Sequence, residues 1–230
     1  MGGFKNETIN TVFDSGIIYI IINHLTKCSK QMKMDCLSNN NPLKNHEDKI
    51  TNRLVARYLN VEDNIFRYEP QSPENYDDAT DQYVGRIDIK VIPRNPLCEF
   101  QEYFIIECKR IDGTKPYNQK YITDGVARFV SHPPKYSSYC NQNIMFGYVV
   151  KAIDIHNNAG EIDSLQSSLL KGVISTKFAL LQKNDSQYYV YTCKYISPHI
   201  GQIEMWHLFY DFADVILRDA GDSSGDHCQL

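Results

Sequence analysis

The stretch VGRIDIKVIPRNPLCEFQEYFIIECKR, residues 84–110, decides the fold. It contains two apolar runs, residues 84–92 and 103–111, in which single charged residues stand among β-branched and aromatic ones. A polar segment with two prolines separates the runs, and prolines are typical of turns and strand ends. The stretch therefore predicts two successive strands joined by a loop.

The second run carries an acid and a base two residues apart. Side chains alternate between the two faces of a strand, so we expect Glu107 and Lys109 on one face and Ile106 and Cys108 on the other. A simple ion pair between Glu107 and Lys109 would explain this pattern without any function.

The first run adds a charge that such a pair does not explain. We expect Asp88 to point away from Ile87, Ile89 and Val91, and burying a carboxylate inside an apolar strand is costly. A bound divalent cation would offset the cost, because carboxylates are hard oxygen ligands for Mg²⁺ and a nearby ammonium can orient or deprotonate a water.

An aspartate on one strand followed by Glu-x-Lys on the next resembles the core of the PD-(D/E)XK nuclease superfamily, the restriction-endonuclease-like fold. Here Asp88 is followed, after eighteen residues, by Glu107-Cys108-Lys109, and Ile87 stands where many members have proline. The resemblance implies an α/β fold with a mixed central sheet flanked by helices. It also implies Asp88, Glu107 and Lys109 as catalytic residues, and Mg²⁺, for which Mn²⁺ can substitute. Asp88, Glu107 and the backbone carbonyl of Cys108 would hold the metal.

The segment before these strands predicts a helix over about residues 46–60, whose apolar stripe places Glu47 on the inward face. An acid in the first turn of a helix interacts favourably with the helix dipole. In the superfamily, the first core helix often contributes an acid to the metal site, so Glu47 is a candidate fourth ligand. Both explanations stay open at this stage.

The segment after Glu-x-Lys predicts a helix over residues 117–130, followed by a buried strand over 143–152. In the superfamily this helix carries polar residues toward the scissile phosphate, so Gln119 and Arg128 are candidate substrate-binding residues. A lone helical arginine is also often a surface ion-pair partner. The order strand, strand, helix, strand extends the resemblance over residues 46–152.

The rest of the chain gives weaker predictions. We expect residues 1–219 to form one domain and residues 220–230 a disordered tail. His199 and His207 lack metal-ligand spacing, and we expect structural roles for them. The remaining predicted elements are a helix (8–27), a first strand (65–70), a solvated acidic loop (71–82), a helix (160–172), a strand (187–195) and a strand running into a helix (203–216).

Composition limits the possible environments and partners. The net charge of −4 excludes a strongly basic coating protein. Residues 61–82 carry seven acids and one arginine, whereas residues 107–136 carry six Lys or Arg and three acids, so a phosphate backbone should lie along the second stretch. Seven scattered cysteines, no visible signal peptide and no long apolar run predict a soluble cytoplasmic protein with reduced thiols and no membrane contact.

Together these features predict a Mg²⁺-dependent endonuclease that acts on nucleic acid, with DNA favoured over RNA, in restriction or anti-phage defence. Residues 197–212 are also similar to the tails of bacterial restriction-like and phage-defence nucleases. The alternative is a catalytically silent or partner-activated subunit. Such a subunit would act as a homo-oligomer or in a larger defence complex with an ATPase or a sensor.

Overall fold

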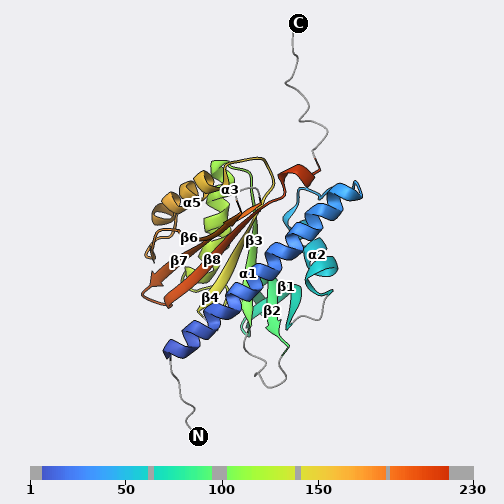
Figure 1. The fold of residues 1–230 in the computed structure, drawn as a ribbon. Coiled ribbons are helices and arrows are strands. Elements are labelled where there is room, and N and C mark those ends of the chain that lie inside the picture. Colours follow the sequence, from blue (N-terminus) through green and yellow to red (C-terminus); the bar gives the residue numbers. More distant parts are fainter. Residues whose placement is uncertain (1–6, 62–64, 95–102, 138–140, 185–186, 218–230) are drawn as a thin grey trace.

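A computed structural model describes residues 7–61, 65–94, 103–137, 141–184 and 187–217 as a mixed α/β fold (Figure 1). The strands are β1 (Phe66–Asp77), β2 (Gln82–Pro93), β3 (Phe104–Ile111), β4 (Gln142–Val149), β5 (Ile174–Ser175), β6 (Ala179–Asn184), β7 (Tyr188–Ser197) and β8 (Gly201–Asp211). The α-helices are α1 (Glu7–Ser38), α2 (Glu47–Leu54), α3 (Lys115–Tyr121), α4 (Ala127–Val130) and α5 (Ile155–Leu169). Short π-helical segments at Val55–Leu59 and Ile122–Val126 continue α2 and α3, and a 3-10 turn spans Ala213–Val215.

One mixed sheet of eight strands organises the chain, in the order β1-β2-β3-β4-β8-β7-β5, with β6 also paired to β7. β1, β2 and β3 are antiparallel neighbours, whereas β3, β4 and β8 run parallel to one another. β4 is buried along its whole length. Both faces of these central strands are covered. Their sequences are therefore nearly continuous apolar runs.

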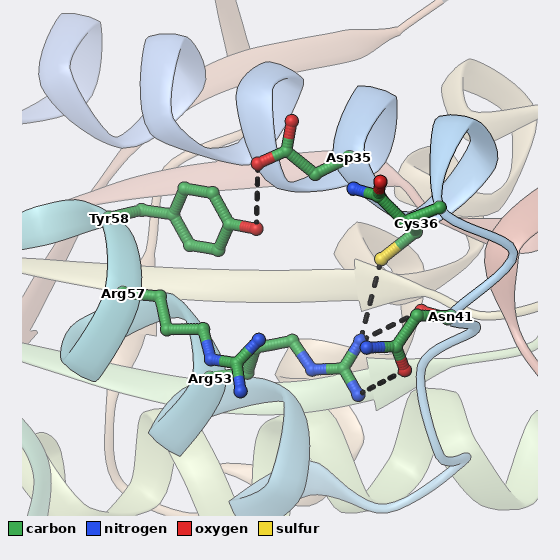
Figure 2. Close-up of a pocket in the computed structure, with 7 residues that line it drawn as sticks. Asp35, Cys36, Asn41, Arg53, Arg57 and Tyr58 are labelled. Atoms are coloured by element: carbon green, nitrogen blue, oxygen red, sulfur yellow. Dashed lines mark hydrogen bonds between the residues drawn. The ribbon is translucent and has the colours of Figure 1, made fainter.

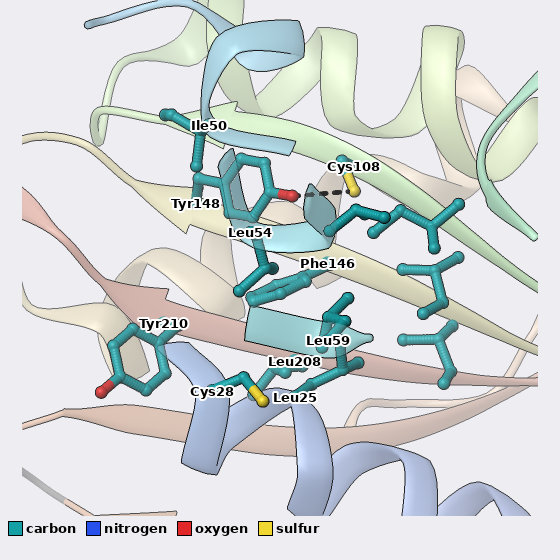
Figure 3. Packing of buried hydrophobic residues seen from close by; sticks show 14 of the residues in the cluster. Leu25, Cys28, Ile50, Leu54, Leu59, Cys108, Phe146, Tyr148, Leu208 and Tyr210 are labelled. Carbon is teal, nitrogen blue, oxygen red and sulfur yellow. Dashed lines mark hydrogen bonds between the residues drawn. The ribbon is translucent and has the colours of Figure 1, made fainter. Parts of the chain in front are cut away.

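Helices cover both faces of the sheet and form a separate core on each. α1 and α2 pack on one face, where Leu25, Leu54 and Phe146 of β4 belong to one buried apolar cluster (Figure 3). α3 and α5 pack on the other face, where Tyr121 and Ile162 join a second apolar cluster. α1 therefore packs on the sheet along much of its length. Several of its apolar side chains are nevertheless exposed to solvent.

The predicted core elements are confirmed. The strands predicted at 84–92, 103–111 and 143–152 correspond to β2, β3 and β4, and the helices predicted at 46–60 and 117–130 correspond to α2 and α3 with their continuations. α1 runs eleven residues beyond its predicted end at 27. β5 and β6 were not predicted, and their largely exposed residues lack the alternating pattern of a half-buried strand.

The acidic segment 71–82 is a strand and a tight turn, and the prediction of a solvated loop was wrong. β1 continues to Asp77 and stays paired with β2 from Phe66 to the turn. Charged residues and prolines are tolerated there because β1 is an edge strand. The cross-strand contact between Tyr76 and Tyr83, with ring centroids 5.2 Å apart, also favours pairing. The predicted terminal helix is only the turn at Ala213–Val215.

Two findings bear on the environment of the chain. Among the described residues, no helix is long and apolar enough to span a membrane. Cys28, Cys36, Cys108 and Cys193 are buried free thiols. The predicted tail at 220–230 lies outside the described residues.

His207 is completely buried in β8, as a structural role requires. Its Nδ1 lies 2.9 Å from the Tyr121 hydroxyl and its Nε2 lies 3.2 Å from the Tyr195 hydroxyl. Burial lowers the pKa of His207 to about 3, so the ring is neutral in the folded protein at neutral pH.

The depressed pKa of His207 predicts a loss of stability in acid. A histidine that is harder to protonate when folded contributes stability above its unfolded pKa of about 6.5, and this contribution falls as the pH drops. Between pH 7 and pH 5 the loss should be about 2 kcal/mol. Urea unfolding at both pH values should show this loss as the change in the unfolding free energy of the wild type relative to the change in His207→Gln. The exposed His46 provides the control, because His46→Gln should keep the wild-type pH dependence.

Candidate active site

The candidate site lies where β2 and β3 separate. These strands pair through Ile89–Ile106, Lys90–Ile105 and Val91–Phe104, and these are all the pairs between them among the described residues. Asp88 and Glu107 are the next residues after the last pair. The two carboxylates of the sequence motif therefore meet at the opening between the strands.

The direction of the Asp88 side chain corrects the simple alternation expected for β2. Ile89 packs in the core under α1 and α2, whereas Ile87 packs in the core on the opposite face. β2 thus changes face at Asp88. The Asp88 carboxylate lies across the opening toward β3, where its Oδ2 accepts a hydrogen bond from the backbone N–H of Cys108 at 2.8 Å.

Four oxygen atoms surround the ammonium group of Lys109. Its Nζ lies 2.6 Å from Glu107 Oε1, 3.1 Å from Glu47 Oε1 and 3.8 Å from Asp88 Oδ2. It also donates to the backbone carbonyl of Cys108 at 2.7 Å. The structure therefore brings together the predicted catalytic residues, the predicted carbonyl and Glu47.

Glu47 reaches the site because α2 begins beside β3. It is the first residue of α2, and its Oε2 accepts a hydrogen bond from the backbone N–H of Arg110 at 3.2 Å. Its other oxygen faces Lys109. The contact with Lys109 favours a role for Glu47 in the site. Its position in the first turn of α2 also agrees with the favourable interaction with the helix dipole.

The Glu107 carboxylate is fully buried and has partners on both oxygens. The Tyr136 hydroxyl donates to Oε2 at 2.8 Å, and Arg128 Nη1 lies 3.2 Å from Oε1. Arg128 also donates to the Tyr136 hydroxyl, whose oxygen lies 2.6 Å from the backbone carbonyl oxygen of Arg86, so the single hydroxyl hydrogen is shared between that carbonyl and Glu107. The sequence does not predict Tyr136 as a site residue, because its local pattern, a tyrosine shortly after a His-Pro-Pro segment, indicates no function.

The two candidate substrate-binding residues are placed differently. Arg128 reaches the site and pairs with Glu107, and its Nε is buried with no hydrogen-bond acceptor in the described part of the chain. Gln119 is partly buried on α3, and among the described residues it makes no hydrogen bond to the site carboxylates. Its substrate-binding role stays a prediction. The thiol of Cys108 lies on the far face, where the Tyr148 hydroxyl is 3.1 Å away (Figure 3).

The protonation of the cluster follows from burial and charge. Burial raises the pKa of Glu107 to about 7, and Asp88 adds to the rise while Lys109 and Arg128 oppose it. Burial alone would lower the pKa of Lys109, but Glu107, Glu47 and Asp88 outweigh it and raise that pKa. At neutral pH Lys109 is therefore an ammonium, and Glu107 lies near its titration midpoint.

The donor set suits a hard divalent cation. Carboxylate and carbonyl oxygens are the preferred ligands of Mg²⁺, and the cluster supplies both kinds. Within the described ranges, no three histidine, cysteine or carboxylate side chains already share one metal position. The Lys109 ammonium occupies the centre of the oxygens, so a metal there requires Lys109 to move.

A pocket of about 110 Å³ lies elsewhere, between the end of α1 and α2 (Figure 2). Arg53 in this pocket donates to the backbone carbonyl of Asn41 at 2.9 Å, and Asp35 accepts from the Tyr58 hydroxyl at 3.1 Å. Local partners therefore engage both Arg53 and Asp35. The pocket contains none of the candidate catalytic residues.

Comparisons with known proteins add no identification. A scan of protein-family models, a search of curated proteins and a search of solved structures each gave no match.

The raised pKa of Glu107 predicts that stability falls as this carboxyl ionises. An acid whose pKa rises from 4.5 to about 7 on folding costs no stability below its unfolded pKa, and the cost grows as the pH rises to the folded pKa. Between pH 5 and pH 8 the cost should grow by roughly 2–3 kcal/mol. His207 changes stability in the opposite direction over this range, so urea unfolding should show the decline as the difference in pH dependence between the wild type and Glu107→Gln.

The control is Glu69→Gln, which changes a surface carboxylate paired with Arg67. This variant should keep the wild-type pH dependence. The same pH dependence in Glu107→Gln as in the wild type would contradict the raised pKa.

Proposed function

We propose that this protein is a Mg²⁺-dependent endonuclease with a restriction-endonuclease-like fold, and that it acts on DNA. The observation that carries the proposal is the convergence of four oxygens, from Glu47, Asp88, Glu107 and the Cys108 carbonyl, around Lys109. A structural ion pair needs only one acid for one base. Here three carboxylates face two bases, Lys109 and Arg128, so the acids outnumber the bases, and a divalent cation would neutralise the remaining negative charge.

The arrangement of the sheet supports the fold assignment. Three antiparallel strands are followed by a helix and a strand parallel to the third, which is the order implied by the resemblance. The two carboxylates lie at the end of the β2–β3 pairing. Lys115 and Lys120 of α3 are exposed, and such groups would offer contacts to substrate phosphates.

Asp88, Glu107, Glu47 and the Cys108 carbonyl would hold the metal, which supplies charge neutralisation and a more acidic water when bound. Neutralising these carboxylates would remove the charges that raise the pKa of Lys109, and Lys109 would then accept a proton from the attacking water. The water oxygen bonds to phosphorus and the bond from phosphorus to the 3′-oxygen breaks. The leaving 3′-oxygen takes a proton from solvent, which gives a 5′-phosphate and a 3′-hydroxyl.

A second candidate function is a partner-activated subunit of a defence complex. The burial of the site favours it, because Asp88, Glu107 and Lys109 are 4%, 0% and 7% exposed. A phosphate group cannot contact Glu107 while Tyr136, Arg128 and Lys109 occupy its oxygens. Binding of an ATPase or sensor partner, or of another copy, would then open the site.

Cleavage of supercoiled plasmid and of linear duplex tests the proposal. With Mg²⁺ or Mn²⁺ the wild type should cut, and EDTA should abolish cutting. Lys109→Met should lower the rate by about 10²–10⁴-fold, because it removes the group that accepts the proton. Lys171→Met is the matched control, since Lys171 is an exposed lysine after the end of α5, and it should retain the wild-type activity.

Cutting that survives in Lys109→Met would refute the assigned site. Folded wild-type protein that binds metal but does not cut would favour the partner-activated subunit.

A further inference from the structure

Gln71 of β1 lies directly across from Asp88 of β2. The register pairs Pro70 with Ile89 and Ser72 with Ile87, which leaves Gln71 opposite Asp88. Gln71 and Asp88 are therefore cross-strand neighbours, and a glutamine side chain is long enough to extend from β1 toward the Asp88 carboxylate.

The backbone at Gln71 adopts the left-handed region, with φ of +56°. This conformation is unfavourable for a residue with a side chain, whereas glycine adopts it readily. It accompanies the change of face in the hairpin, because Tyr68 packs in the core under α1 and α2 while Glu74 hydrogen-bonds Tyr103 of the opposite core. A strained backbone of this kind persists where the surrounding structure requires it, often at functional sites.

The side chain of Gln71 carries a second cost. Its Nε2 and Oε1 are both buried, and neither has a hydrogen-bond partner within the part of the chain that the structure describes. Buried amides almost always have partners, since an unpaired donor or acceptor loses its bonds to water. If this position served only to bend the backbone, glycine would avoid both the unfavourable φ and the unpaired amide.

Asn75 of the same strand shows that β1 can satisfy such a residue. It also has a left-handed backbone, with φ of +54°. Its Nδ2 donates to the carbonyl of Lys135 at 2.9 Å, and its Oδ1 accepts from the Ser137 hydroxyl at 2.9 Å. Of these two left-handed residues, the one facing Asp88 has the unpaired amide.

We propose that Gln71 is a further ligand-contacting residue of the candidate site. Its Oε1 accepts a hydrogen bond from a water on the divalent cation, and its Nε2 donates to an oxygen of the substrate phosphate. A primary amide offers one acceptor and two donors, which matches a hydrated cation beside an anion. This inference rests on the proposed nuclease function and adds a residue on β1, which the Asp and Glu-x-Lys motif does not include.

The test compares Gln71→Gly with Asn75→Gly. Thermal unfolding is measured with and without Mn²⁺, and plasmid cleavage is measured in parallel. Without Mn²⁺, Gln71→Gly should have a Tm at least equal to that of the wild type, because glycine relieves the backbone and removes the unpaired amide. Its Mn²⁺-induced rise in Tm should be at most half that of the wild type, and its cleavage at least tenfold slower. Asn75→Gly should lower the Tm but keep the full response to Mn²⁺.

The wild type and Glu107→Gln separate the two possible failures. If Mn²⁺ raises the Tm of the wild type but not of Glu107→Gln, the cation binds at the proposed site. A full Mn²⁺ response and full cleavage in Gln71→Gly would then overturn the role of Gln71 alone. If Mn²⁺ does not change the Tm of the wild type and no cleavage occurs, the proposed function fails and the role of Gln71 fails with it.

Discussion

The placement of one ammonium among three carboxylates is the constraint on which the rest of the site depends. Lys109 lies on a central strand where both faces are covered, so its charge must be paired inside the protein. β2, α2 and β3 each supply one carboxylate. The separation of β2 from β3 gives these groups the space that continuous pairing would remove. The sheet therefore loses regularity where the charges meet.

The same cluster limits what the protein can do without a ligand. Glu107 is saturated by Lys109, Arg128 and Tyr136, and burial still raises its pKa to about 7. A carboxylate that is costly to ionise despite these partners gains from a stronger positive charge nearby. A divalent cation would supply that charge and release Lys109 from its acceptors. In the proposed metal-dependent mechanism, one cation would therefore replace another in the cluster.

Much of the site could be predicted because its spacing is local. Glu107 and Lys109 are two residues apart on one strand, and the helical stripe of α2 places Glu47 inward. Tyr136 could not be predicted, because its contact with Glu107 depends on how the chain folds back 29 residues later. The continuation of β1 through an acidic, proline-containing segment depends on pairing with β2, and local propensity indicates a loop there.

The local sequence pattern also could not predict that β2 changes face at Asp88. This change of face explains how the site is built. Strict alternation would place Ile87 and Ile89 together and send Asp88 to the opposite face. The observed strand divides these isoleucines between two cores, so Asp88 turns into the sheet opening and reaches the backbone of β3. A carboxylate on either face would bury its charge in an apolar core. The irregular hairpin is therefore what allows an apolar sheet to hold an acidic site.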